Sequence, residues 1–213
     1  MSEDCLINFY GRDFTVTPDV LIPRPETEMV IDAVLSLVGK PFLPGVKPSK
    51  AKVPKDCKIL DVGTGSGCIA VTLKKELSEA RISASDISEE ALTVARENAA
   101  KFNAIVNFMK SDLLDGINGD FDIIVANLPY VDENWDWINK EALSAEPALA
   151  LYAKDGGLEL IKKLIRQASE RENKYLILEA DPSQHEEITG FAKFNKYELF
   201  EVRGFILVYK KRD

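Results

Sequence analysis

The sequence is poor in the residues that most often cross-link small proteins or bind metals. It contains three cysteines, Cys5, Cys57 and Cys68, and none of them forms a Cys-x-x-Cys pair. An odd number of separated thiols supports neither a disulfide framework nor a cysteine-rich zinc site. The one histidine, His185, is predicted at an exposed helix start, which argues against a histidine triad or zinc site. We therefore expect no bound metal.

Long hydrophobic runs and excess positive charge are also missing. The longest apolar segments, residues 123–126 and 175–178, have the length of a strand, and the first residues are acidic. The sequence thus predicts neither a membrane span nor a signal peptide, and we expect a cytoplasmic protein. A net charge of -8 argues against affinity gained mainly by neutralising phosphates. No direct nucleic-acid binding is expected, and a monomer is favoured.

The 213 residues, 46% hydrophobic and 29% charged, suit one domain with a full core. Residues 1–39 predict a hairpin around Gly11 and a helix that begins near Pro25, both packed on that core. The helix has an apolar stripe at Val30, Ala33, Val34, Leu37 and Val38. Residues 40–56, rich in lysine and proline, predict a linker to the main domain, residues 57–213.

The main domain alternates strand-like and helix-like segments. Strands are predicted at residues 58–62, 81–85, 106–109, 121–126 and 175–179. Two helix faces are marked by apolar stripes: Leu92, Ala95, Ala99 and Phe102; then Leu158, Ile161, Leu164, Ile165 and Ala168. Almost continuously apolar strands are typical of a parallel sheet covered by helices on both faces. Residues 197–209 predict a closing antiparallel hairpin.

A glycine-rich turn follows the first strand of this domain. Gly63, Gly65 and Gly67 stand between that strand and a helix, where glycine permits a tight turn and the helix start offers N–H groups to an anion. The third glycine comes one residue too early for a dinucleotide fingerprint, and Cys68 fills the expected place. No lysine followed by serine or threonine comes after the loop, which excludes a P-loop.

Two carboxylates follow the next two strands. Asp86 is placed to accept hydrogen bonds from a ribose diol, and Ser88 is the better helix cap there. Asp112 could meet an adenine amino group or serve as a turn carboxylate.

The segment Asn127-Leu128-Pro129-Tyr130 follows the strand at 121–126, at the same sheet edge as the glycine turn. An amide nitrogen is a poor nucleophile, so methyl transfer to it needs acceptors that aim its lone pair. The Asn127 oxygen and the Leu128 carbonyl can be those acceptors, and Tyr130 offers a face for stacking. A polar turn after a buried strand is the alternative.

At this point the sequence resembles a known family over nearly its whole length: class I S-adenosylmethionine-dependent methyltransferases, specifically the HemK/PrmC-type enzymes that methylate N5 of glutamine in peptide chain release factors. The resembling segments are Phe9-Tyr10-Gly11 with Phe14 and Val16, residues 20–28 (VLIPRPETE), residues 61–70, Asn127 to Tyr130, Glu146-Pro147-Ala148-Leu149, Asp155-Gly156-Gly157-Leu158, Glu179 and Gln184.

The resemblance implies a Rossmann-like, mostly parallel seven-stranded sheet. It implies S-adenosyl-L-methionine as cofactor and the Gly-Gly-Gln glutamine of a release factor as substrate. Asn127, Leu128, Pro129 and Tyr130 would hold that glutamine. The cofactor would be bound by Gly63, Thr64, Gly65, Ser66, Gly67, Asp86, Asp112, Leu113 and Asn127.

The sequence departs from the family pattern in several places, and Ala153 and Asp181 stand where glycines are common. Leu128 replaces the first proline of the usual Asn-Pro-Pro-Tyr, and bacterial members carry a helical domain ahead of the hairpin, where this chain has only a few residues. Two alternatives therefore stay open: an adenine-N6 or other amine methyltransferase acting on nucleic acid, and a cofactor-binding module without independent activity. Whether Arg24, Glu26 and Glu28 form the site rim or fix the helix is also open.

Overall fold

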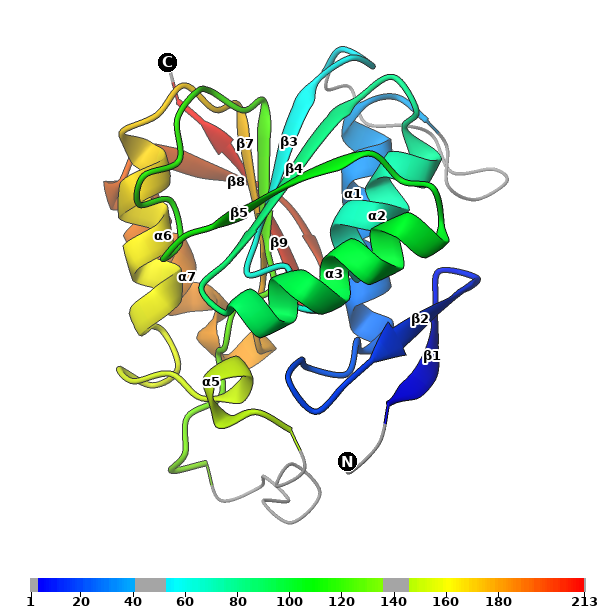
Figure 1. Cartoon of the computed structure of the whole chain (residues 1–213). Helices are drawn as coiled ribbons and strands as arrows, with labels where there is room; N and C mark the ends of the chain where they lie inside the picture. Colours follow the sequence, from blue (N-terminus) through cyan, green and yellow to red (C-terminus); the bar gives the residue numbers. More distant parts are fainter. Residues whose placement is uncertain (1–3, 41–52, 136–145, 213) are drawn as a thin grey trace.

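The computed structural model describes residues 4–40, 53–135 and 146–212. Its main sheet has seven strands: β3 (Lys58–Val62), β4 (Arg81–Asp86), β5 (Val106–Lys110), β6 (Ile123–Ala126), β7 (Tyr175–Glu179), β8 (Tyr197–Arg203) and β9 (Ile206–Lys211). Their order across the sheet is β5-β4-β3-β6-β7-β9-β8 (Figure 1). The first five strands are parallel, and β9 runs antiparallel to both β7 and β8.

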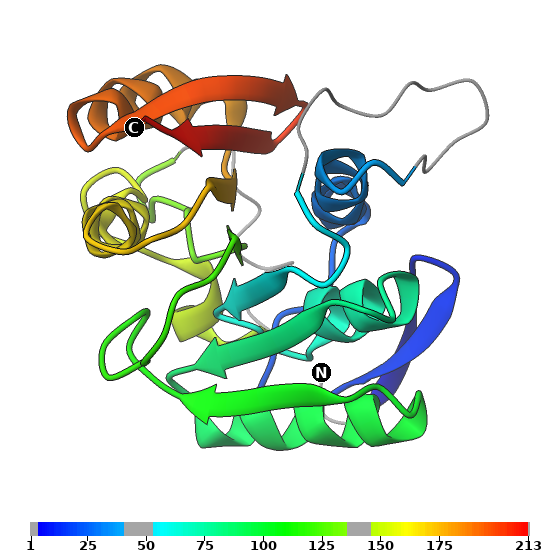
Figure 2. The same cartoon turned by 90° about the horizontal axis from the view of Figure 1, so that it is seen from above.

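Helices cover both faces of this sheet. They are α1 (Glu28–Leu37), preceded by a 3-10 turn at Pro25–Thr27, α2 (Cys68–Glu76), α3 (Glu89–Lys101), the short α5 (Ala148–Leu151), α6 (Glu159–Ser169) and α7 (His185–Phe194), preceded by a 3-10 turn at Pro182–Gln184. Figure 2 shows α1 and α2 on one side of the sheet and α6 and α7 on the other. Within the described ranges, no helix has the length and apolar character needed to cross a bilayer.

Two apolar cores result because successive strand residues point to opposite faces. On β3, Ile59 belongs to the core under α1 and α2, whereas Leu60 belongs to the core under α6 and α7. Ile123 and Ile124 divide in the same way on β6. Strands buried on both faces explain why their sequences are almost continuously apolar.

The N-terminal hairpin forms a separate two-stranded sheet of β1 (Cys5–Phe9) and β2 (Arg12–Val16). Its turn residues, Tyr10 and Gly11, both have positive φ, 51° and 72°, as a tight hairpin turn requires. The Tyr10 hydroxyl donates to Asp32 Oδ1 at 2.9 Å, and the Tyr10 amide donates to Glu28 Oε1 at 2.7 Å. These bonds attach the hairpin to α1.

The strands predicted from sequence are present, with small shifts at their ends. β6 begins at Ile123 instead of residue 121. Just before it, the Asp122 side chain accepts the Lys58 amide at 3.0 Å. His185 begins α7 as predicted, but it is half-buried instead of exposed, since its ring packs against the Ala180 carbonyl at 3.2 Å. Most of the predicted linker, residues 41–52, lies outside the described residues.

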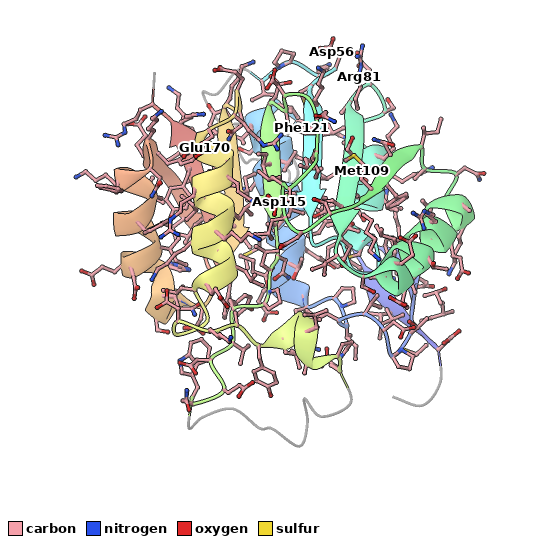
Figure 3. All side chains as sticks on the ribbon, turned by 60° about the vertical axis from the view of Figure 1, so that its left-hand side comes forward. Asp56, Arg81, Met109, Asp115, Phe121 and Glu170 are labelled. Carbon is pink, nitrogen blue, oxygen red and sulfur yellow. The ribbon has the colours of Figure 1, made fainter. Side chains whose placement is uncertain are left out.

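The chain order creates a switch point between β3 and β6. From β3 the chain moves outward to β4 and β5, then returns to place β6 on the other side of β3. Figure 3 shows Asp56 and Arg81, at the amino ends of β3 and β4, at the edge of the sheet opposite α5. In open α/β sheets the crevice outside the carboxyl ends of two such strands binds ligands.

Candidate active site

A cavity of about 380 Å³ opens at the carboxyl ends of β3, β4 and β6. Its wall is built from the glycine turn, the residues that follow β4, β5 and β6, the α5 region, and residues between β2 and α1. Figure 1 shows the N-terminal hairpin and α5 at this same lower end of the molecule. Such a volume suits a small-molecule ligand.

The glycine turn is tied to the neighbouring strand. The amides of Gly63 and Thr64 both donate to the Ser85 carbonyl, at 2.8 and 2.9 Å. Gly63 has a φ of +72°, and a Cβ there would lie 2.9 Å from Leu128 Cδ2. The left-handed backbone conformation favours glycine here, and the Leu128 side chain would have to shift to admit a Cβ.

A buried carboxylate supports the turn from below. Asp61 is 0% exposed and accepts the Thr64 hydroxyl at 2.6 Å. Burial raises the Asp61 pKa to about 7, although the hydrogen bond from Thr64 opposes that shift. The Thr64 side chain is therefore held toward Asp61 at the edge of the cavity that Thr64 lines.

Gly67 also has a packing role at the start of α2, and its predicted cofactor contact stays a prediction. Gly63, Thr64, Gly65 and Ser66 all line the cavity, and Gly67 is not among the lining residues. It caps α2 with a φ of +79°, and a Cβ there would lie 3.0 Å from the Ala95 Cβ. Glycine at 67 permits the close contact between the starts of α2 and α3, whereas the first part of the turn faces a ligand.

Asp86 ends β4 at the cavity wall, as predicted. Its Oδ2 accepts the Gly65 amide at 2.9 Å, and its Oδ1 accepts the Ser88 amide at 3.0 Å. Ser88 caps α3 by accepting the Ala91 amide at 3.1 Å, which confirms its predicted cap role. Each Asp86 oxygen retains acceptor capacity, so the carboxylate is held in place for a ligand hydroxyl.

Asp112 and Leu113 also line the cavity. The Asp112 Oδ2 accepts Lys163 Nζ at 2.6 Å, and both side chains are partly exposed. Leu113 has a φ of 53°, an uncommon conformation for a leucine. Asp112 thus lines the cavity and also forms an ion pair at the surface. Both interpretations given for it, an adenine contact and a turn carboxylate, stay open.

The segment after β6, which we call the acceptor loop (residues 127–130), lies beside the glycine turn. Val62 pairs with Ala126, so Gly63 and Asn127 emerge next to each other. Asn127, Leu128 and Pro129 line the cavity. Asn127 Nδ2 donates to Thr27 Oγ1 at 3.0 Å. With Nδ2 turned toward Thr27, Oδ1 is the atom that remains to accept a hydrogen bond from a ligand.

Tyr130 differs from its neighbours because it is not among the cavity-lining residues. Its hydroxyl donates to Glu179 Oε1 at 3.3 Å, and burial raises its pKa well above the ordinary value. Its carbonyl accepts Gln184 Nε2 at 2.8 Å. Three of the four acceptor-loop residues thus face the cavity, and Tyr130 joins the loop to β7 and α7.

Two residues of this site had been given no role from sequence. Thr27 lines the cavity and accepts the Asn127 side chain. Glu179, at the end of β7, is 1% exposed, and burial raises its pKa to about 7 while hydrogen bonds from Thr27, Tyr130 and Asn127 oppose the shift. The resemblance to the family includes both positions, and this was the only sign in the sequence that they matter. Their place in the site depends on contacts with residues far away along the chain.

The segment between β2 and α1 forms one wall of the cavity. Arg24 pairs with the buried Glu146 at 2.5 Å, and the Ile22 amide donates to the other Glu146 oxygen at 3.2 Å. Glu28 accepts the Tyr10 amide. The sequence left open whether Arg24, Glu26 and Glu28 border the site or fix the helix. Arg24 and Glu28 fix the chain that borders the cavity, whereas Glu26 is exposed.

Comparison with known proteins agrees with this geometry. A family model described as "Methyltransferase small domain" matches residues 48–179. The chain is 46% identical over 167 residues to the release factor glutamine methyltransferase of Koribacter versatilis, covering 76% of this chain and 54% of that protein. It is 38% identical over 199 residues to the protein of the same name from Neisseria gonorrhoeae, covering 91% and 67%.

The chain belongs to the release factor glutamine methyltransferase family. The resemblance predicted from its motifs is confirmed. The chain spans about half the length of the Koribacter relative and two thirds of the Neisseria relative.

The fold of this family member is also found among solved structures. Ribosomal protein L11 methylase from Lactobacillus delbrueckii subsp. bulgaricus matches with a TM-score of 0.61 at 25% identity, covering 93% of this chain and 84% of that one. The predicted fold class, a Rossmann-like methyltransferase sheet with a C-terminal antiparallel hairpin, is confirmed.

The methyltransferase cavity suits a nucleoside cofactor with an amino-acid end. Asp86 places a carboxylate at the cavity wall, and a Cβ added at Gly65 would meet nothing within 4 Å, so the turn leaves room for a ligand against its backbone. In the part of the chain that the structure describes, no cluster of three or more histidine, cysteine or acidic side chains is arranged to hold a metal ion.

Proposed function

We propose that this family member transfers a methyl group from S-adenosylmethionine to the side-chain amide nitrogen of a protein glutamine, the glutamine of Gly-Gly-Gln in a peptide chain release factor. The observation that carries the proposal is the position of Asn127 beside Gly63, with Nδ2 bonded to Thr27. The transfer would take place in the cytoplasm, where release factors act.

The cofactor would lie along the three strand ends that border the cavity. Asp86 would accept the ribose hydroxyls, the glycine turn would border the amino-acid end, and Asp112 and Leu113 would border the adenine. When bound, S-adenosylmethionine supplies a methyl group on a positively charged sulfur.

The acceptor loop would hold the glutamine amide and aim its nitrogen. Asn127 Oδ1 and the Leu128 carbonyl would each accept one hydrogen of the NH2 group, and this removes the rotational freedom of the nucleophile. Orientation of this kind supplies most of the rate, and the amide loses its proton after the methyl group has been transferred. No general base is needed before transfer.

Leu128 fits this arrangement without the proline that relatives commonly have there. Its carbonyl is available whichever residue occupies the position, and its side chain is buried against Gly63. The contact between Leu128 and the turn replaces part of the stiffness that a fixed proline φ would give.

Methylation of a release factor tests the proposal directly. Purified protein would be incubated with labelled S-adenosylmethionine and, in parallel, a release factor, its Gln→Ala variant in Gly-Gly-Gln, and ribosomal RNA, with the products read by mass spectrometry. We expect label on the release factor and none on the variant. Label on RNA alone would support the adenine alternative, and cofactor binding without any label would support a module that lacks independent activity.

Asp86→Asn tests the cofactor part separately by calorimetric titration with S-adenosylmethionine. Loss of a charge-assisted hydrogen bond to the diol should weaken binding by about 1.5–3 kcal/mol, which is roughly ten- to a hundredfold. Lys163→Ala, which removes only the surface partner of Asp112, should bind as the wild type does.

A further inference from the structure

The chain between β2 and α1 borders the cavity from one end to the other. Residues 18–27, which we call the covering segment, contribute Pro18, Asp19, Val20, Leu21, Pro23 and Thr27 to the lining. Near its start, Val20 packs in an apolar cluster with residues of α3, the helix that follows Asp86. Near its end, Thr27 accepts a hydrogen bond from Asn127 in the acceptor loop. The covering segment therefore runs from the Asp86 side of the cavity to the Asn127 side.

One carboxylate holds the middle of the covering segment. Glu146, whose side chain is 5% exposed, accepts Arg24 Nη2 at 2.5 Å with one oxygen and the Ile22 amide at 3.2 Å with the other. Pro23, between these two bonded residues, lines the cavity, and so does Pro147, directly after Glu146. The carboxylate thus joins two walls of the cavity that lie more than 100 residues apart along the chain, the covering segment and the α5 region.

The three attachments of the covering segment differ in chemistry. Apolar packing holds its start and a hydrogen bond between neutral groups holds its end, whereas an ion pair holds its middle. A charge-assisted hydrogen bond is about twice as strong as a neutral one. The Arg24 side chain is 34% exposed and Glu146 is nearly buried, so salt screens this pair only in part. The ion pair is therefore the attachment whose loss should free the covering segment most.

We propose that Glu146 is a positioning residue for the cofactor, whose ion pair with Arg24 holds the covering segment closed over the cavity and slows the release of S-adenosylmethionine. The inference rests on the proposed function, which places the cofactor along the strand ends. A cofactor in that place lies between the strand ends and the covering segment. Its way out widens when the covering segment moves away from the α5 region, and the ion pair opposes that movement.

A chase experiment measures this release directly. Protein loaded with labelled S-adenosylmethionine would be mixed with excess unlabelled cofactor, and the label retained by the protein on a filter would be followed with time. Arg24→Gln removes the charge and keeps a polar side chain. We expect release to become about tenfold faster, as loss of one charge-assisted hydrogen bond predicts, while the association rate does not fall.

Glu146→Gln and the double variant show whether the two residues act as a pair. Glu146→Gln keeps an oxygen for the Ile22 amide but loses the charge that pairs with Arg24, so it should also speed release. Because both changes break the same ion pair, the double variant should release the cofactor no faster than Arg24→Gln does. Accelerations that multiply in the double variant would show two independent effects and would overturn the proposal.

Arg12→Gln is the matched control. Arg12 pairs with Glu76 at 2.7 Å and also joins two distant segments, β2 and α2, but neither residue lines the cavity. This variant should release the cofactor at the wild-type rate. Wild-type release in Arg24→Gln would overturn the proposal, as would equally fast release in Arg12→Gln.

The dependence of release on salt separates an ion pair from a purely steric contact. Release from the wild type should become faster as sodium chloride is added, and this dependence should be weaker in Arg24→Gln. An equal dependence in both proteins would overturn the proposal. These measurements contain no release factor, so a wild type that binds the cofactor but methylates no release factor would count against the proposed function alone. A wild type that binds no S-adenosylmethionine would overturn both.

Discussion

At the residue scale, two adjacent glycines show how the acceptor loop is supported. Gly156 and Gly157 both have left-handed φ values, +65° and +83°. A Cβ at Gly157 would lie 1.9 Å from the Tyr130 carbonyl oxygen, whereas a Cβ at Gly156 would meet nothing within 4 Å. The same carbonyl also accepts Gln184 Nε2. Gly157 therefore permits the approach of the acceptor loop to the chain before α6.

Gly157→Ala should displace the acceptor loop, and Gly156→Ala should not. Both variants carry the left-handed strain of about 1–2 kcal/mol, but only the first adds a clash with backbone. In urea unfolding we expect Gly157→Ala to lose clearly more stability than its neighbour, and in the methylation assay to lose activity. Equal stability and activity of the two variants would show that the loop moves aside at no cost.

The sequence could place residues at the cavity where one short segment contains the whole signal, and their roles toward a ligand stay predictions. Gly63, Gly65, Asp86 and Asn127 follow strands directly and line the cavity, as predicted. Periodicity could not show that Ala95 closely approaches Gly67, whose predicted ligand contact stays a prediction. Thr27 and Glu179 had no assigned role because their partners lie 100 and 49 residues away along the chain.

At the element scale, one buried side chain on α3 connects strand β2 to the glycine turn. Asn98 on α3 is 0% exposed. Its Oδ1 accepts the Thr15 amide at 2.9 Å, and its Nδ2 donates to the carbonyls of Thr15 and Ser66 at 2.8 and 2.9 Å. One amide thus connects the hairpin, α3 and the glycine turn, because it can both donate and accept.

Asn98→Ala should loosen β2 from α3 and the glycine turn, while the bonds of Tyr10 keep the hairpin on α1. Three hydrogen bonds are lost and buried backbone groups are left unpaired, so we expect a destabilisation of about 2–4 kcal/mol. Hydrogen exchange should become faster at the Thr15 amide, while the amides that pair β1 with β2 change less. Protection of Thr15 equal to that in the wild type would contradict the proposed anchor.

The helices and strands could be predicted because each follows from the pattern of apolar residues within its own segment. The apolar stripes of α1 and α6 are buried as predicted, and the bounds of β3 and β7 agree with the predicted ranges. The entry to α1 was less accurate, because Pro25 begins a 3-10 turn and the α-helix begins at Glu28. The docking of the hairpin on α1 and α3 could not be derived, since it depends on contacts between distant segments.

At the scale of the whole molecule, two buried carboxyls make the stability depend on pH. Asp61 and Glu179 both have pKa values raised to about 7, from 3.8 and 4.5, and burial is the main cause in each case. The folded protein therefore holds these protons at a pH where the unfolded chain has lost them. Their contribution to stability is complete below the unfolded pKa and is lost as the pH rises through about 7.

Glu179→Gln should flatten this dependence, because the variant cannot ionise there. Between pH 4.5 and 7, ionisation of Glu179 in the unfolded chain should lower the free energy of unfolding by about 1.4 kcal/mol for each pH unit. Free energies of unfolding from urea titrations across this window should fall less steeply in the variant, and Asp61 should supply the remaining slope. A variant slope equal to that of the wild type would show that Glu179 is not protonated in the fold.

The sequence by itself determined the strands, the helices and the order of chemical groups at the strand ends. These follow from local periodicity, glycine conformation and the rule that parallel strands bring their carboxyl ends to one edge. Only the tertiary structure decided which groups face the cavity, which side of Asn127 turns inward, and how Thr27, Glu146 and Glu179 support the site. The physical reason is that burial and hydrogen-bond direction belong to the packed arrangement of segments far apart in the chain.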